Sequence, residues 1–313
     1  MRKRRLGGTG LEVSEIGFGS WQIGADDSWE RIGEDAAVRL VHEAIGAGVD
    51  LFDTAPNYGG GESERRLGKA LRGKRDDVTI VSKVGHRVDG PKDFSVDSFW
   101  ESLHGSLRRL ATDRIDAVLL HNPPFEIYEG TDPIWEALQE ARRQGKIRHY
   151  GASLDFAREI EACLRNTGSE VLEILFNIFH QDVRKAFPLV RERGAGTVVK
   201  VPLDSGWLTG RYDGRSRFDG VRGRWSDEEI RRRAGLVERL GWLTADGSEL
   251  AWKAIGFLLS YDEVGCVIPG IRTADHLRSS LQAPDHVVSA AERSRLETFW
   301  DEITSGGASP LPW

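Results

Sequence analysis

The sequence is poor in the features that mark secreted, membrane-spanning or nucleic-acid-binding proteins. Its 313 residues include only two cysteines, Cys163 and Cys266, which are too few for a disulfide framework, so we expect a cytoplasmic protein. No apolar run approaches the roughly 18 residues that a membrane-spanning helix needs. The net charge of −6 provides no basic footprint for nucleic acid. We therefore expect neither a membrane nor a nucleic-acid partner.

Motifs of several enzyme classes are missing as well. No G-x-G-x-x-G turn follows the first predicted strand, which argues against a flat, doubly wound sheet. The helix motif H-E-x-x-H is absent, and the first strand carries no H-x-H pair. A metal hydrolase needs such ligands around an open metal position, so we expect no metal site.

The chain does contain a regular alternation of short, β-rich apolar runs and longer helical patterns. Short, nearly continuous apolar runs are typical of parallel strands buried on both faces. Eight β–α units in one chain predict the α/β class and a (β/α)8 TIM barrel. The predicted strands cover 15–21, 49–53, 78–84, 115–121, 148–153, 171–177, 196–202 and 264–270, and helical patterns cover 34–48, 63–73, 95–110, 132–145, 155–166, 226–242, 248–260 and 273–282.

The organisation predicted from these patterns is a single domain over residues 1–313. Residues 4–13 read as an N-terminal β-hairpin that could cover one end of the barrel, and the tail over 303–313 is expected to be disordered. The stretch 204–225, rich in Gly, Arg and Trp, reads as a long loop. Long βα loops are where barrels build function.

Polar residues stand where several predicted strands end. Asp53, Lys83, His121, Ser153 and Asn177 end successive strands, and in a barrel such residues converge on the C-terminal face. A single His or Asn there is more often a loop anchor. A buried Lys needs a carboxylate partner, and Asp53 on the neighbouring strand is the obvious one. A purely structural Asp–Lys pair is the alternative.

The set Asp53, Tyr58, Lys83 and His121 makes sense as a device that delivers a proton to a carbonyl oxygen. The reference pKa of a tyrosine is about 10, so a phenol is a poor acid–base group near neutral pH. A nearby Lys⁺ favours the phenolate and is expected to lower that pKa. Asp53 would keep the Lys charged and oriented, and His121 could donate a hydrogen bond to the substrate oxygen.

The chain resembles the aldo-keto reductase family at this point. The resemblance rests on FDTAPNYGGGESE, VSKV, LLHNPP, YGAS, PLDSGWLTG and VIPGIRTADHL, in this order and over essentially the whole chain. It implies that Tyr58 is the general acid, that Lys83 and Asp53 tune it, and that His121 orients the carbonyl. It also implies a nicotinamide dinucleotide lying extended across the C-terminal face.

The same resemblance assigns residues to the cofactor. Ser153 would hold the nicotinamide carboxamide, and Asn177 matches the family residue at its position. The loop 202–210 would meet the pyrophosphate, with Gly206 permitting close approach. Departures from the family pattern are Leu154 for Asn, Glu173 for Gln, Phe176 for Tyr and Lys200 for an aromatic residue. The cofactor-binding set predicted here is Ser153, Glu173, Asn177, Pro202, Leu203, Gly206, Leu208, Gly270, Arg272, Thr273, His276 and Ser280.

The segment GIRTADH, after the last strand, opens a helix whose free N–H groups and dipole favour an anion. Arg272 adds a charge suited to a phosphate, and Thr273 adds a hydroxyl. The plain alternative is a capped helix with a solvated Arg. The resemblance favours the 2′-phosphate of NADP, although His276 and Ser280 stand where relatives carry other residues.

Four aromatic residues follow strand ends or lie in their loops and could wall an apolar substrate pocket, although ordinary loop packing explains each one equally well. They are Trp21, Trp29, Phe125 and Trp207. The whole pattern predicts an NADP-dependent oxidoreductase that interconverts aldehydes or ketones and alcohols, with a small-molecule carbonyl or alcohol as its substrate. A cofactor-binding sensor or regulatory subunit of the same fold is the alternative. Whether the protein is a monomer or a homo-oligomer stays open.

Overall fold

Eight parallel strands form the centre of the computed structural model, which describes residues 1–24 and 30–312. Each strand pairs with the strand that follows it in the chain, from β3 to β10. The strands are β3 (Phe18–Gly19), β4 (Leu51–Asp53), β5 (Thr79–Val84), β6 (Ile115–His121), β7 (Ile147–Leu154), β8 (Val171–Leu175), β9 (Gly196–Lys200) and β10 (Cys266–Val267).

The first and last strands of this sheet meet and close the barrel. The backbone N–H of Gly17 donates to the carbonyl of Val267 at 2.8 Å, and the N–H of Val267 donates to Glu15 at 2.9 Å. Parallel bridges join Ile16 to Val267 and Gly19 to Gly270. The predicted (β/α)8 fold is confirmed. β3 and β10 are shorter than the predicted 15–21 and 264–270, because their outer residues join only through these isolated bridges.

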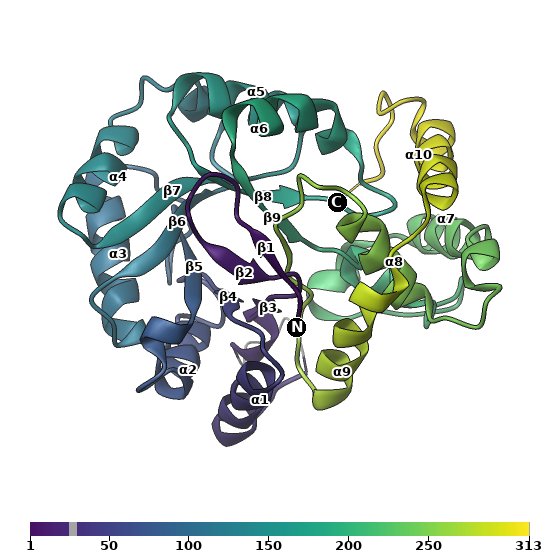
Figure 1. The fold of residues 1–313 in the computed structure, drawn as a ribbon, viewed down its shortest axis with the longest axis horizontal. Coiled ribbons are helices and arrows are strands. Elements are labelled where there is room, and N and C mark those ends of the chain that lie inside the picture. The colour runs from purple at the N-terminus through teal and green to yellow at the C-terminus, as the bar shows by residue number, and fades with distance from the viewer. Residues whose placement is uncertain (25–29, 313) are drawn as a thin grey trace.

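Helices surround the barrel, and Figure 1 shows α1 to α6 following one another around its outside. Ser95 caps the start of α3, since its hydroxyl accepts the N–H of Ser98. Two helices, α6 and α10, were not placed by the sequence patterns. The helices are α1 (Glu34–Gly46), α2 (Glu62–Ala70), α3 (Val96–Leu110), α4 (Ile134–Arg143), α5 (Ala157–Asn166), α6 (Phe187–Arg193), α7 (Asp227–Glu238), α8 (Leu250–Leu259), α9 (Ala274–Gln282) and α10 (Ala290–Thr304).

The barrel interior is built from every second residue of the strands. Its apolar layer contains Leu51, Val81, Leu119, Val171 and Val198, all fully buried. Side chains alternate between the two faces of a strand, so the residues two positions further on point the same way. Those next residues are polar, namely Asp53, Lys83, His121, Glu173 and Lys200. An apolar plug therefore lies beneath a polar layer at the C-terminal end of the barrel.

The predicted N-terminal hairpin closes the opposite end. β1 (Lys3–Arg5) pairs antiparallel with β2 (Glu12–Ser14), and Figure 1 shows the hairpin crossing the barrel opening. Leu6 and Val13 are fully buried and belong to the same apolar cluster as the barrel interior. The hairpin thus supplies part of the barrel core.

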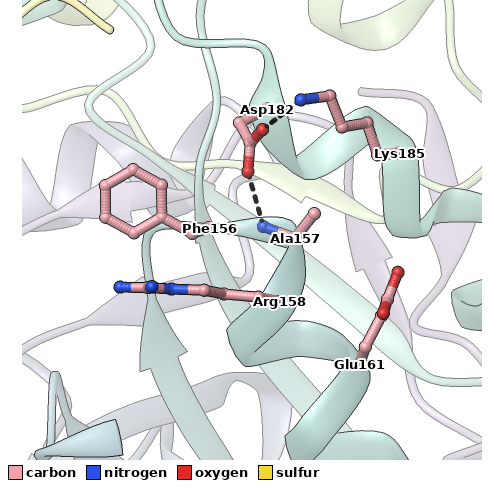
Figure 2. Close-up of a pocket in the computed structure, with 6 residues that line it drawn as sticks. All are labelled: Phe156, Ala157, Arg158, Glu161, Asp182 and Lys185. Atoms are coloured by element: carbon pink, nitrogen blue, oxygen red, sulfur yellow. Dashed lines mark hydrogen bonds and ion pairs between the residues drawn. The ribbon is translucent and has the colours of Figure 1, made fainter. Parts of the chain in front are cut away.

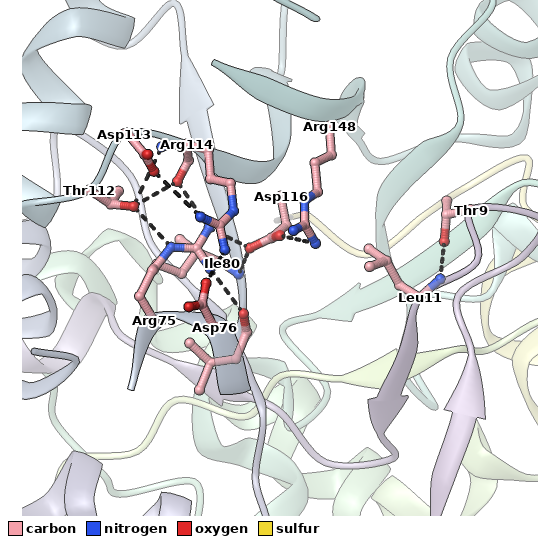
Figure 3. Close-up of polar contacts among 11 residues, drawn as sticks. Thr9, Leu11, Arg75, Asp76, Ile80, Thr112, Asp113, Arg114, Asp116 and Arg148 are labelled. Atoms are coloured by element: carbon pink, nitrogen blue, oxygen red, sulfur yellow. Dashed lines mark hydrogen bonds and ion pairs between the residues drawn. The ribbon is translucent and has the colours of Figure 1, made fainter. Parts of the chain in front are cut away.

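An ionic cluster ties the strands together near this N-terminal end (Figure 3). The buried carboxylate of Asp116 lies 2.7 Å from Arg75 Nη2 and 3.1 Å from Arg148 Nη1, and it accepts the backbone N–H of Ile80 at 2.9 Å. Arg75 also donates to the hydroxyl of Thr112. These contacts join β5, β6 and β7 far along the strands from their polar C-terminal ends.

The chain after α10 lies against the protein. Leu311 is buried, and Arg233 donates to the carbonyl of Pro312 at 2.5 Å. The single domain over 1–313 and the disorder expected for 303–313 stay predictions. None of the helices over residues 1–24 and 30–312 is long and apolar enough to cross a membrane.

Candidate active site

A buried ion pair lies at the C-terminal end of the barrel interior. Lys83 Nζ is 2.6 Å from Asp53 Oδ2, and it donates to the carbonyl of Thr54 at 3.1 Å. The side chains of Lys83 and Asp53 are 0% and 4% exposed. The contact predicted between these two residues is confirmed. It depends on β4 and β5 being neighbours with both side chains on the inner face.

A second carboxylate, that of Glu173 on β8, reaches the same ammonium. Glu173 Oε2 lies 3.1 Å from Lys83 Nζ, and its side chain is 2% exposed. Burial and the neighbouring Glu173 raise the pKa of Asp53 well above its usual range. Burial also acts to raise the pKa of Glu173, but Lys83 and Lys200 hold it below its usual value. Two carboxylates therefore share one buried cation, which the sequence reasoning did not foresee.

Tyr58 lies in the loop after β4, over this ion pair. Its ring stacks on Trp21 at a centroid distance of 5.6 Å, and Lys83 Nζ lies 5.2 Å from the ring centroid. The expected fall in the tyrosine pKa is wrong for this structure. Lys83 does act to lower the pKa of Tyr58, but burial of the phenol is the larger effect and raises it above its usual value. Tyr58 is therefore a protonated phenol here.

His121 ends β6 with its ring edge toward Tyr58, at a centroid distance of 6.1 Å. Burial, followed by the charge of Lys83, lowers the pKa of His121 well below its usual range. The imidazole is therefore neutral near neutral pH. Because a neutral imidazole keeps one N–H, His121 can donate a hydrogen bond to a substrate oxygen.

His86 stacks on His121 and was missed by the sequence reasoning. The two rings lie 4.0 Å apart at an interplanar angle of 18°. Burial and the nearby Lys92 lower the pKa of His86 to about 4. His86 stands three residues after Lys83, in the loop that leaves β5, and that position is the signal that could have found it.

The residues expected around the nicotinamide form one polar network. Ser153 donates its hydroxyl to Glu173 Oε1 at 3.1 Å and accepts from Lys200 Nζ at 2.8 Å. Lys200 Nζ also donates to Asn122 Oδ1 at 3.0 Å and pairs with Asp155 at 2.8 Å. Lys200 and Glu173, two departures from the family pattern, thus meet on one hydroxyl. Of the other two departures, Leu154 and Phe176 are fully buried apolar residues.

The amide of Asn177 is used to shape its own turn. Its Nδ2 donates to the carbonyl of Val201 at 3.0 Å, and its Oδ1 accepts the backbone N–H of Phe179 at 2.9 Å. Further along, Ser205 and Gly206 have φ angles of 54° and 102°. The N–H of Gly206 donates to the carbonyl of Leu203 at 2.8 Å, so this N–H is used within the turn. The pyrophosphate contact stays a prediction.

The same loop places other predicted residues inside the protein. Pro202 and Leu208 are buried, and Leu203 is half-buried. Trp207 was expected in the substrate pocket, but its side chain is fully buried and packs edge-on against Tyr212, Phe218 and Trp225. Its position comes from this aromatic cluster, which holds the long loop together.

The residues assigned to the adenosine end lie around the start of α9. Thr273 caps the helix, with its hydroxyl accepting the N–H of His276 at 3.2 Å. Arg272 pairs with the carboxylate of Glu30 at 2.9 Å. Ser280 is buried and donates back to the carbonyl of His276. Gly270 is an exposed residue where an added Cβ would lie 3.0 Å from the Gln22 side chain. The cap at Thr273 agrees with the alternative of a capped helix, whereas Arg272 is paired with a carboxylate and is not simply solvated.

The other residues predicted for the substrate pocket do not lie together in the structure. Trp21 is half-buried and stacks on Tyr58 beside the ion pair. Phe125 is 39% exposed, and the Arg158 guanidinium lies 5.5 Å from its ring centroid. Trp29 lies outside the described residues. A separate surface pocket is lined by Phe156, Arg158 and Asp182 among others (Figure 2). It contains none of the four residues of the proposed catalytic tetrad, Asp53, Tyr58, Lys83 and His121.

Comparisons with known proteins show the family to which the chain belongs. A family model described as "Aldo/keto reductase family" matches residues 15–301. The chain belongs to the aldo/keto reductase family. A holo-form aldo-keto reductase from Bacillus halodurans superposes with a TM-score of 0.81 at 30% identity, covering 96% of each chain.

Curated relatives of this aldo/keto reductase are similar over nearly their full lengths. An NADH-specific methylglyoxal reductase from Escherichia coli is 32% identical, over 97% of this chain and 99% of the relative. An L-galactose dehydrogenase from Arabidopsis thaliana is 28% identical, over 90% and 87% respectively. These two relatives are named for different substrates. The chain therefore belongs to an oxidoreductase family that acts on more than one substrate.

Proposed function

We propose that this aldo/keto reductase transfers a hydride between NADP(H) and the carbonyl or alcohol carbon of an aldehyde or ketone, with Tyr58 as the general acid and base. The observation that carries the proposal is the buried Asp53–Lys83 pair beneath Tyr58. A structural ion pair does not need a phenol on one side and a neutral imidazole on the other. These four groups together match proton delivery to an oxygen atom.

Each residue of this tetrad has a separate task. A bound nicotinamide dinucleotide would supply or accept the hydride. Tyr58 gives its proton to the carbonyl oxygen, and the charge of Lys83 stabilises the phenolate that remains. Asp53 keeps the ammonium in place. His121 donates a hydrogen bond to the same carbonyl oxygen, which its neutral state allows.

The cofactor would lie across the strand ends from Ser153 to the start of α9. The hydroxyl of Ser153 suits an amide, and the loop 202–210 would lie near the pyrophosphate. The preference for NADP over NAD rests on the start of α9, where Arg272 supplies the charge and Thr273 a hydroxyl. Glu30 neutralises that guanidinium, and one relative is named for NADH, so the two cofactors must be compared directly.

Cofactor oxidation with a panel of aldehydes and ketones tests the proposal. We expect NADPH-dependent turnover for at least one carbonyl, and Tyr58→Phe should lower it by about 10² or more while cofactor binding persists. Near-wild-type turnover in Tyr58→Phe would overturn the role of Tyr58.

A second candidate is a cofactor-binding regulatory subunit with little turnover. It is supported by a relative from Oryza sativa, 28% identical over 91% of this chain and named as a probable voltage-gated potassium channel subunit beta. Cofactor binding without turnover across the whole panel would favour this candidate.

A further inference from the structure

We propose that Asp53 and Glu173 share one proton in the cofactor-free protein and release it when an oxidised, positively charged nicotinamide binds beside Ser153. This inference rests on the proposed function, because it needs a nicotinamide at Ser153. It adds a proton-coupled step that is specific to the oxidised cofactor.

The geometry requires a shared site for this proton. Both carboxylates approach Lys83 Nζ, at 2.6 Å for Asp53 and 3.1 Å for Glu173, and all three side chains are at most 4% exposed. Two buried carboxylates around one ammonium leave one negative charge uncompensated. Such pairs retain a proton instead of ionising fully, because two like charges at this range cannot both be stabilised.

The other charged groups that face this pair explain how a bound cofactor would act on it. Lys200 on β9 reaches Glu173 through the hydroxyl of Ser153, and Asp155 compensates most of its charge. A nicotinamide cation beside that hydroxyl would add one positive charge next to Lys200. Losing the shared proton supplies the matching negative charge and relieves the repulsion.

The proton balance is simple. One O–H bond of the carboxyl pair breaks, both carboxylates are then ionised, and the proton passes to the buffer. A reduced nicotinamide ring is neutral, so it provides no reason for this release. His86 and His121 cannot supply the proton, since both imidazoles are already neutral. Burial acts to lower the pKa of Lys83, but Asp53 and Glu173 hold it above its usual value, so Lys83 keeps its proton. Tyr58 and Lys200 are the groups that must be tested as other sources.

Titration calorimetry measures the proton directly. NADP⁺ and NADPH are each bound to the full-length protein in two buffers with different ionisation enthalpies, and the difference in heat gives the protons released. We expect up to one more proton for NADP⁺ than for NADPH. The comparison cancels any contribution of the 2′-phosphate, which both cofactors carry. The Kd of NADP⁺ should then fall as pH rises, by up to about tenfold per pH unit, across the pH range in which the pair titrates.

Variants identify the source of the proton. Glu173→Gln keeps polar contacts to Ser153 and Lys83 but cannot share a proton, so the extra release should disappear. Tyr58→Phe and Lys200→Arg should retain it, because arginine keeps the positive charge of residue 200 and does not release a proton in this pH range. Glu170→Gln, a change next to β8 whose side chain pairs outside the barrel with Arg142, is the matched control and should also retain it.

The outcomes separate the two proposals. If neither cofactor binds, the proposed function fails. If both bind and release equal numbers of protons, or if Glu173→Gln still releases the extra proton, the shared-proton inference is wrong while the proposed function stands. Loss of the release in Tyr58→Phe or Lys200→Arg would assign the proton to that residue and overturn the inference as well.

Discussion

Replacing Lys83 by methionine should destabilise the protein strongly, and the loss should depend on pH. Lys83 is fully buried and is the cation that both Asp53 and Glu173 approach within 3.1 Å. Methionine keeps most of the volume but removes the charge. Leaving a buried ionic partner uncompensated costs about 3–5 kcal/mol.

The pH dependence follows from the carboxylates that remain. Without Lys83, both carboxyl groups take protons more readily, so their folded-state pKa values rise above the unfolded ones. Groups with raised folded-state pKa values stabilise the folded state below the unfolded pKa, and this contribution is lost as pH rises through the folded value. The free-energy deficit of Lys83→Met should therefore be larger at alkaline than at acidic pH.

Urea unfolding of wild type and variant at about pH 5.5 and about pH 8.5 measures both effects. Lys253→Met is a matched control, because Lys253 is also nearly buried but pairs with Asp246 and Glu292, which are 54% and 29% exposed. Its loss should be near 1 kcal/mol or less. A deficit for Lys83→Met below about 0.5 kcal/mol, or one equal at both pH values, would refute a buried, shared cation.

Three other perturbations test separate parts of the structure. Arg272→Ala should weaken the binding of NADPH about tenfold or more and leave the binding of NADH nearly unchanged, because a charge-assisted bond to phosphate contributes about 1.5–3 kcal/mol. Fluorescence titration with both cofactors measures the two dissociation constants, and equal losses of affinity would remove the preference for NADP. Asp116→Asn should cost about 1–3 kcal/mol in urea unfolding, since it leaves the Arg75 and Arg148 guanidiniums without their carboxylate, and an unchanged midpoint would contradict the bridging role. His86→Phe should retain the stack and raise the pKa of His121. Burial and Lys83 lower that pKa most, and the charge that His86 carries once it is protonated in acid lowers it further. NMR titration of the imidazole in the acidic range measures the shift, and a fall would contradict this reasoning.

Much of the candidate site follows from strand periodicity. Asp53, Lys83 and His121 each stand two residues beyond an apolar barrel-interior residue, and this spacing alone sends their side chains inward. Adjacent strands in a barrel also follow one another in the chain, so the contact between Asp53 and Lys83 could be predicted from order alone.

Tertiary structure alone decided what crosses the barrel or depends on burial. Glu173 is 90 residues from Lys83 and on a strand that is not its neighbour, so only closure of the barrel brings the two together. Loop packing put Trp207 inside an aromatic cluster and His86 over His121. The pKa of Tyr58 is a balance between an attractive charge, which the sequence contains, and desolvation, which exists only after the chain has folded around the phenol.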